Sequence, residues 1–262
     1  MIGLRTLGFE ASEIHPVVSH TDGRPFVPTT WYGLDGYFQL STSLPLDVCL
    51  TGHGVESGRL PLLRDGDGFS VHEMESVSLL GRLRPAGEVT AFSAAKTTNV
   101  FGRVGARFFE DATLALDPAE PCVAVGESRW QPPQPTEYDR FPHLGESILP
   151  LTDQFRFVEA PDAPVVALLA SDRSTSYASK KLIEALRRRK AGRPWRTRLV
   201  LPSGREFEVT IEARDQPPRF AVDLGAPSID LVIGMDLLRR GYTVFDWIEH
   251  VTWFGHYPLM AT

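Results

Sequence analysis

Residues 231–255, LVIGMDLLRRGYTVFDWIEHVTWFG, carry the pattern that decides the fold. The apolar run at 231–233 predicts a buried strand that Gly234 ends, and residues 235–240 suit one or two helical turns. Two runs of β-branched and aromatic residues follow, with a polar turn between them. The stretch therefore predicts a strand, a short helix and a β-hairpin, in that order.

Residues 104–126, VGARFFEDATLALDPAEPCVAVG, repeat this pattern without a gap. Gly105 aligns with Gly234 and Asp117 aligns with Asp246, and the difference in residue number is 129 in both cases (234 − 105 and 246 − 117). A fixed offset of about half the chain length indicates two copies of one structural unit.

We place the two units at residues 1–129 and 130–262 and call them the first and the second half. A Pro-rich linker at 130–147 opens the second half, and its QPPQP segment favours an extended, polyproline-II-like conformation. Two hairpins are expected at equivalent places, one at 60–71 and a clearer one at 198–211, around the turn Pro202-Ser203-Gly204.

The order of strand, Gly-Met-Asp-Leu-Leu and Thr-Val-Phe-Asp resembles the C-terminal part of a lobe of the retropepsin-like aspartic proteases. In that family, an upstream apolar strand leads into Asp-Thr/Ser-Gly, which carries one catalytic aspartate per lobe. Here, strands at 37–40 and 165–169 lead into two turns that are related by the same offset (170 − 41 = 129). The turns are Ser41-Thr42-Ser43 and Ala170-Ser171-Asp172.

The resemblance implies a mainly β fold with short helices. It predicts two tandem retropepsin-like lobes in one chain, related by a pseudo-twofold axis and separated by a cleft. The family mechanism needs two carboxylates that share one proton, and neither Ser41 nor Ala170 supplies one. Thr42 and Ser171 keep the hydroxyl that, in the family, hydrogen-bonds across to the opposite loop.

We therefore expect an inactive homologue, a pseudoprotease, that binds a peptide or protein segment in the cleft and uses no cofactor or metal. The resemblance also assigns the hairpin at 198–211 to a flap that folds over the cleft. The expected binding positions are Ser41, Thr42, Ser43, Ala170, Ser171, Asp172, Ser203 and Gly204.

Two alternatives stay open. An active hydrolase would use a displaced carboxylate such as Asp172. A docking scaffold would instead use a basic surface, although the same charges also suit a helix C-terminus. That surface comprises Arg187, Arg188, Arg189, Lys190, Arg193, Arg196 and Arg198.

Composition limits the remaining classes. A formal net charge of −6 argues against a nucleic-acid partner, which needs a basic face. The short apolar runs predict no membrane span and no signal peptide. With only two cysteines, Cys49 and Cys122, we expect a reducing, cytoplasmic location and a pseudo-dimer within one chain, as a monomer or in a larger complex. A metal cluster of His53, His72, Glu73 and Glu75 is not favoured, because neighbouring strand residues face opposite sides.

Overall fold

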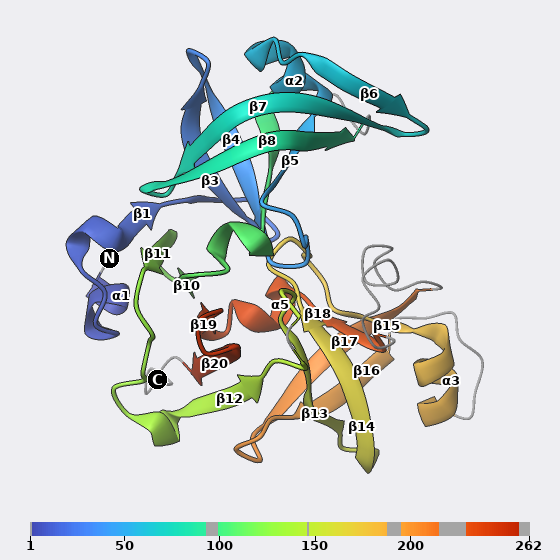
Figure 1. The fold of residues 1–262 in the computed structure, drawn as a ribbon. Helices are drawn as coiled ribbons and strands as arrows, with labels where there is room; N and C mark the ends of the chain where they lie inside the picture. The colour runs from blue at the N-terminus through green and yellow to red at the C-terminus, as the bar shows by residue number, and fades with distance from the viewer. Residues whose placement is uncertain (1, 93–98, 146, 188–194, 215–228, 257–262) are drawn as a thin grey trace.

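The structure, a computed structural model, describes residues 2–92, 99–145, 147–187, 195–214 and 229–256. It is mainly β, with 54% of residues in strands and 14% in short helices, as the sequence predicts. Three sheets share the chain (Figure 1). None of the helices formed by the described residues is long and apolar enough to cross a bilayer.

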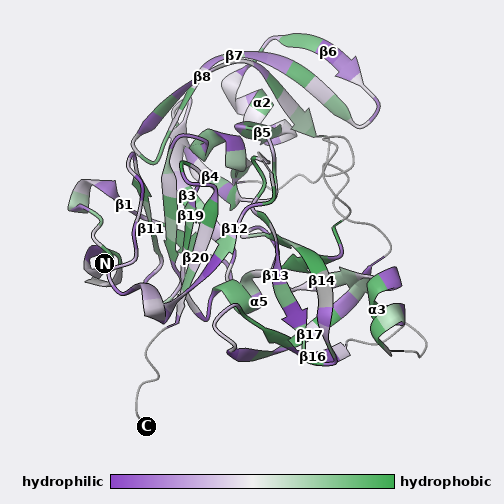
Figure 2. Ribbon diagram, turned by 60° about the horizontal axis from the view of Figure 1, so that its bottom comes forward, coloured by the Kyte–Doolittle hydropathy of each residue, from purple (hydrophilic) through white to green (hydrophobic). Residues whose placement is uncertain are grey.

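Eight strands of the first half form one open sheet, in the order β2-β3-β4-β9-β5-β8-β7-β6. Pairing is parallel between β4 and β9 and between β5 and β8. The predicted hairpin at 60–71 is confirmed as β6 and β7. Buried and exposed residues alternate along much of β7, and Figure 2 shows bands of hydrophilic and hydrophobic residues along it. The strands are β2 (Val18–Ser19), β3 (Pro25–Trp31), β4 (Leu34–Ser41), β5 (Val48–Thr51), β6 (Leu62–Gly66), β7 (Phe69–Leu79), β8 (Arg82–Phe92) and β9 (Val100–Gly105).

Six strands of the second half close into a barrel, in the order β13-β14-β18-β15-β17-β16. Antiparallel pairing of β13 with β16 closes it. The predicted hairpin at 198–211 is confirmed as β16 and β17. The strands are β13 (Leu151–Phe157), β14 (Ala160–Leu169), β15 (Tyr177–Ser179), β16 (Trp195–Val200), β17 (Glu206–Arg214) and β18 (Leu231–Ile233).

A third sheet takes three strands from each half, in the order β1-β11-β10-β19-β20-β12. Its central strands β10 and β19 run antiparallel, with Ala115 opposite Val244. These two residues are themselves equivalent positions of the repeat (244 − 115 = 129), so the pairing is the same read from either half. The strands are β1 (Ile14–Pro16), β10 (Thr113–Asp117), β11 (Cys122–Gly126), β12 (Tyr138–Pro142), β19 (Gly241–Asp246) and β20 (Val251–His256).

The prediction of a linker over residues 130–147 is wrong for residues 138–142. These residues form β12, which pairs with β20 along its whole length, so they belong to the third sheet. Their backbone groups gain partners there, which an extended linker would leave to water.

Short helices connect the strands. Thr51 caps α2, since its side chain accepts a hydrogen bond from the Gly54 N–H, and Arg59 ends the helix in a left-handed conformation. The short helix predicted after residue 234 is confirmed as α5, and η2 is its equivalent in the first half. The helices are α1 (Ile2–Thr6), η1 (Ala11–Glu13), α2 (Gly52–Gly58), η2 (Ala106–Phe109), η3 (Pro135–Glu137), α3 (Lys180–Arg187) and α5 (Met235–Leu238).

Candidate functional site

The two turns singled out by the sequence lie at the ends of β4 and β14. Each of these strands runs parallel to the strand that enters the repeated glycine motif, with Leu40 opposite Val104 and Leu169 opposite Ile233. The two pairs are equivalent in the repeat, because both differences in residue number (169 − 40 and 233 − 104) equal 129. The register of the repeat is thus preserved up to the first residue of each turn.

Backbone hydrogen bonds tie each turn to its own half. The Ala106 N–H donates to the Leu44 carbonyl at 2.7 Å, and the Met235 N–H donates to the Arg173 carbonyl at 2.7 Å. Both bonds join the start of the short helix to the end of the turn. The turn is therefore held by main-chain groups, whatever side chains it carries.

The glycine before each short helix is required by this close approach. A Cβ atom on Gly105 would lie 2.1 Å from the carbonyl oxygen of Leu46, and one on Gly234 would lie 2.8 Å from that of Thr175. Contacts this short with backbone atoms cannot be relieved by a side-chain rotation. The repeated glycine is thus a packing requirement of the turn.

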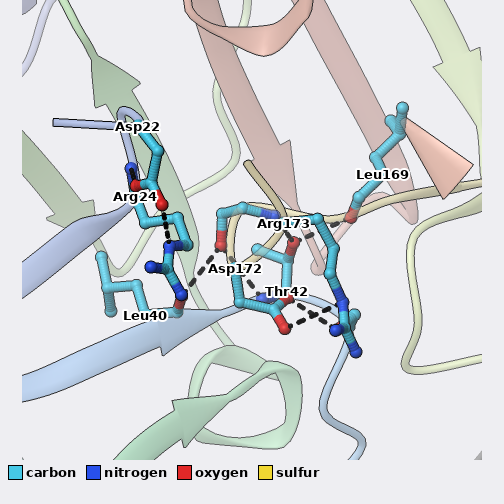
Figure 3. A network of polar contacts seen from close by, with 9 residues as sticks. Asp22, Arg24, Leu40, Thr42, Leu169, Asp172 and Arg173 are labelled. Atoms are coloured by element: carbon cyan, nitrogen blue, oxygen red, sulfur yellow. Dashed lines mark hydrogen bonds and ion pairs between the residues drawn. The ribbon is translucent and has the colours of Figure 1, made fainter. Parts of the chain in front are cut away.

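The two turns meet, as the resemblance implies for the hydroxyls of Thr42 and Ser171. Thr42 Oγ1 donates to the Leu169 carbonyl at 2.8 Å and accepts from the Ser171 N–H at 2.9 Å (Figure 3). In return, Ser171 Oγ donates to the Leu40 carbonyl at 3.3 Å and accepts from the Thr42 N–H at 3.2 Å. Both hydroxyl residues are fully buried. The four bonds form a reciprocal set in which each half supplies the same groups.

No carboxylate stands at the first position of either turn. Ser41 is 2% exposed, and its Oγ has no hydrogen-bond partner among the described residues. Ala170 is fully buried, and its N–H donates to the Ile233 carbonyl. The site therefore has one hydroxyl and one methyl group where two acids would be needed to activate water.

The third positions of the turns also contact each other. Ser43 Oγ donates to Asp172 Oδ1 at 2.6 Å, and Asp172 Oδ2 lies 3.5 Å from Arg173 Nε (Figure 3). The Asp172 carboxylate is therefore buried against a hydroxyl and a guanidinium. Because its counterpart in the first half is a serine, it has no second acid there with which to share a proton.

Ser203 and Gly204 do not lie where the flap prediction puts them. The Ser203 N–H donates to Asp139 Oδ1 on β12 at 2.6 Å, so this hairpin packs against the third sheet and not over the two turns. Asp139 also contacts His256, and although burial alone would raise its pKa, the hydrogen bonds from His256 and Ser203 hold that pKa below its usual value. The segment that joins α3 to β16 includes 188–194, which lie outside the described residues.

Sequence reasoning missed a groove on the first half's sheet. A pocket of about 520 Å³ and another of about 280 Å³ share Thr51 and Arg103 in their linings, and Gln39 lines the larger one. Alternation along β4 puts Gln39 on the same side as Ser41, because Phe38 and Leu40, which alternate with them, point into the core. This alternation, visible in the sequence as polar residues at every second position, is the signal that could have revealed the groove.

Gly68, in the turn between β6 and β7, lines the smaller pocket beside Leu44. The tip of this hairpin thus lies near the first turn of the site. Of the two predicted hairpins, it is the one placed to cover the groove.

One group of side chains has the donor set of a metal site. The ligand atoms of Asp117, Glu120 and Cys122 lie within 4.8 Å of one another. Asp117 Oδ1 accepts backbone N–H bonds from Ala119 and Glu120, and the equivalent Asp246 makes the same pair of bonds in its own hairpin. Structural use of the aspartate as a turn former accounts for this group.

Most of the predicted basic surface lies outside the residues that the structure describes. Residues 188–194, which include Arg188, Arg189, Lys190 and Arg193, lie outside the described residues. Arg196 and Arg198 are exposed on β16, and Arg198 pairs with Glu206 at 2.5 Å.

Neither the comparison with protein-family models nor the comparison with curated proteins gives a match for this sequence.

Proposed function

We propose that the chain is a two-lobed, retropepsin-like pseudoprotease that binds an extended peptide or protein segment beside the two joined turns. The observation that carries the proposal is the reciprocal set of hydrogen bonds made by Thr42 and Ser171. These bonds retain the contact between lobes that the resemblance implies, at positions next to Ser41 and Ala170, which cannot catalyse. Such a chain keeps the architecture of the cleft without its chemistry.

The groove supports binding of an extended segment. Its two pockets lie along one face of the first half's sheet, and a strand-like ligand places alternate side chains on one side, at a spacing that suits successive pockets. The larger pocket falls within the range of volumes typical of ligand sites. The hairpin of β6 and β7, exposed along β6, is in position to close over such a segment.

Hydrolysis through Asp172 is the less supported alternative. A single carboxylate that is buried and bonded to Ser43 lacks the partner acid of the family mechanism. We expect no cleavage of denatured casein between pH 3 and pH 8 in a mass-spectrometric assay. Cleavage that is lost in Asp172→Asn would establish the hydrolase instead.

Binding is tested by selecting dodecapeptides from a random display library on the immobilised protein and measuring their affinity by fluorescence polarisation. Val18→Trp adds bulk at the mouth of the larger pocket, and Leu83→Trp is a matched control on an exposed site of β8 outside both pockets. We expect binding at least ten-fold weaker in Val18→Trp and unchanged in Leu83→Trp.

Two results would overturn the proposal. One is a selection that enriches no peptide over an unrelated immobilised protein. The other is peptide binding that survives Val18→Trp but is lost when Arg196→Glu and Arg198→Glu are combined, because this would move the function to the basic surface of the scaffold alternative.

A further inference from the structure

We propose that the larger pocket of the groove is a carboxylate-binding site, which takes a ligand with an apolar body and one carboxylate. Gln39 and Arg103 supply the polar contacts. The inference deepens the proposed function and rests on it where the carboxylate belongs to a polypeptide.

The lining of the pocket combines apolar and cationic residues. Val18, Phe26 and Val100 supply apolar surface, while Arg24 and Arg103 supply positive charge. None of the described residues that line the pocket is acidic. This lining disfavours a cation and suits an anion with an apolar part.

Gln39 is a buried polar residue in the lining of this pocket. Its side chain is 5% exposed, and its Nε2 has no hydrogen-bond partner among the described residues. Burial of an amide donor without an acceptor is unfavourable, so an oxygen acceptor supplied by a ligand would remove a cost that the unliganded chain bears.

Arg103 stands directly opposite Gln39. The two residues are register partners on β4 and β9, and both line the pocket. Arg103 is exposed, and it forms no salt bridge within the described part of the chain. By contrast, Arg24 is already engaged, because its Nε lies 2.8 Å from Asp22 Oδ2 (Figure 3). Arg103 is thus the guanidinium available to a carboxylate.

The second half shows that the fold does not need this polar pair. In the repeat, the register pair of Gln39 and Arg103 corresponds to Leu168 and Val232 on β14 and β18 (168 − 39 and 232 − 103). Both of these side chains are fully buried. Aliphatic residues satisfy the strand pairing there, so the polar pair points to a ligand in the first half alone.

The carboxylate could belong to a small free acid or to the C-terminus of a polypeptide. The probes are 3-phenylpropionate and its neutral amide, and the peptide Gly-Ser-Gly-Ser-Gly-Phe with a free or an amidated C-terminus. Each amide has nearly the shape of its acid but lacks the negative charge and one acceptor oxygen. Dissociation constants are measured by NMR titration of the full chain and its variants.

We expect at least one acid to bind ten-fold or more tightly than its amide. Arg103→Gln should abolish this preference, and Gln39→Leu should weaken binding of that acid several-fold. Arg205→Gln, an exposed arginine outside both pockets, is the matched control and should change nothing. A preference limited to the small acid identifies a free acid as the source, and a preference limited to the peptide identifies a chain terminus.

Equal affinity of acids and amides, absence of binding by both acids, or a preference that survives Arg103→Gln would overturn the inference. Library peptides that still bind in that case leave the proposed function standing. Conversely, an acid preference shown by 3-phenylpropionate, in a protein that binds no peptide, would support the carboxylate site and remove the proposed function.

Discussion

The two halves share one strand order but differ in how their sheets end. Six strands follow each other as β3-β4-β9-β5-β8-β7 in the first half and as β13-β14-β18-β15-β17-β16 in the second. In the second half the outer two pair with each other, with Phe157 opposite Leu199, and the barrel closes. In the first half β2 and β6 extend the two edges, and the sheet stays open. The strand order thus comes from the repeat, while closure depends on what is added at the edges.

This difference separates a structural half from a half with room for a ligand. In the barrel, Leu168 and Val232 are buried, and both pockets of the groove lie on the open sheet. The added strand β2 contributes Val18 to the lining of the larger of these two pockets. The turn between β6 and β7 contributes Gly68 to the second. The strands added at the two edges, or the turn next to them, thus contribute to the linings of both pockets.

The largest expected effect tests what the halves have in common. Gly105→Ala and Gly234→Ala each place a methyl group against backbone carbonyls, at 2.1 Å and 2.8 Å. We expect both to lower the free energy of unfolding by about 3 kcal/mol or more, with the larger loss for Gly105→Ala. Urea denaturation measures this. A loss below about 1 kcal/mol in either variant would show that the turn in that half can move away.

Local features of this kind are what the sequence predicts well. The glycine, the short helix and the hairpin depend on residues close together in the chain, and all were found where the repeat places them. The meeting of the two turns is what the family resemblance implies for Thr42 and Ser171. The pairing of β10 with β19 was not predicted, because it joins strands from opposite halves of the chain and depends on how the halves dock.

The error over Ser203 and Gly204 has a similar cause. The Pro202-Ser203-Gly204 turn and its flanking strands predict a hairpin correctly, but its position is set by the parallel pairing of β17 with β15. That pairing matches β8 with β5 in the first half, so the hairpin corresponds to β7 and β8. The groove residue Gln39 was missed because the alternation of polar and apolar residues along β4 was interpreted only as a strand that leads into the first turn.

The next prediction compares the two hydroxyl residues at the centre. Thr42→Val removes two bonds of 2.8 and 2.9 Å and leaves a buried carbonyl and a buried N–H without partners. Ser171→Ala removes the longer pair, at 3.2 and 3.3 Å. We expect losses of about 3 and about 2 kcal/mol in the free energy of unfolding, respectively.

The double variant decides whether the four bonds act as one unit. Its loss should be smaller than the sum of the single losses, since the bonds share the same two residues. Thr42→Ser, which keeps the hydroxyl, is the control for the methyl group. Additive losses, or equal losses in Thr42→Val and Thr42→Ser, would contradict the reciprocal set.

A smaller effect concerns the stability of the fold at low pH, where His143 in the second half takes the place of Val17 in the first half. The backbone N–H of His143 donates to the His250 carbonyl, and in the first half the backbone N–H of Val17 donates to the Pro121 carbonyl in the same way. Burial, assisted by the nearby His250, lowers the pKa of His143 to about 3. The folded state thus keeps this ring neutral, while the unfolded state binds a proton below a pKa of about 6.5.

The neutral ring of His143 makes the folded state less stable at low pH. Between pH 6.5 and about 3 the unfolded state carries the extra proton, so stability falls as the pH falls. At pH 5 we expect His143 to contribute a loss of about 2 kcal/mol relative to pH 8. His143→Val, which copies the first half, should remove this part of the loss in urea denaturation. His20→Val, at an exposed histidine, is the control. An unchanged pH profile in His143→Val would show that the ring titrates normally in the folded chain.

The smallest effect bears on the groove itself, where Gln39→Leu and Arg103→Val copy the residues of the closed barrel. Arg103 is exposed, so its replacement should change the free energy of unfolding by no more than about 0.5 kcal/mol.

Gln39→Leu should stabilise the chain by about 1 kcal/mol. The change removes a buried donor, Nε2, that has no acceptor among the described residues, and replaces the amide by an apolar side chain of similar size. Urea denaturation of both variants without ligand measures this, with Leu168→Gln as the reverse change in the barrel and an expected loss of about 3 kcal/mol. A loss of stability in Gln39→Leu would mean that the amide serves the fold, and the contrast between an open, ligand-ready half and a closed, structural half would then lose its clearest chemical difference.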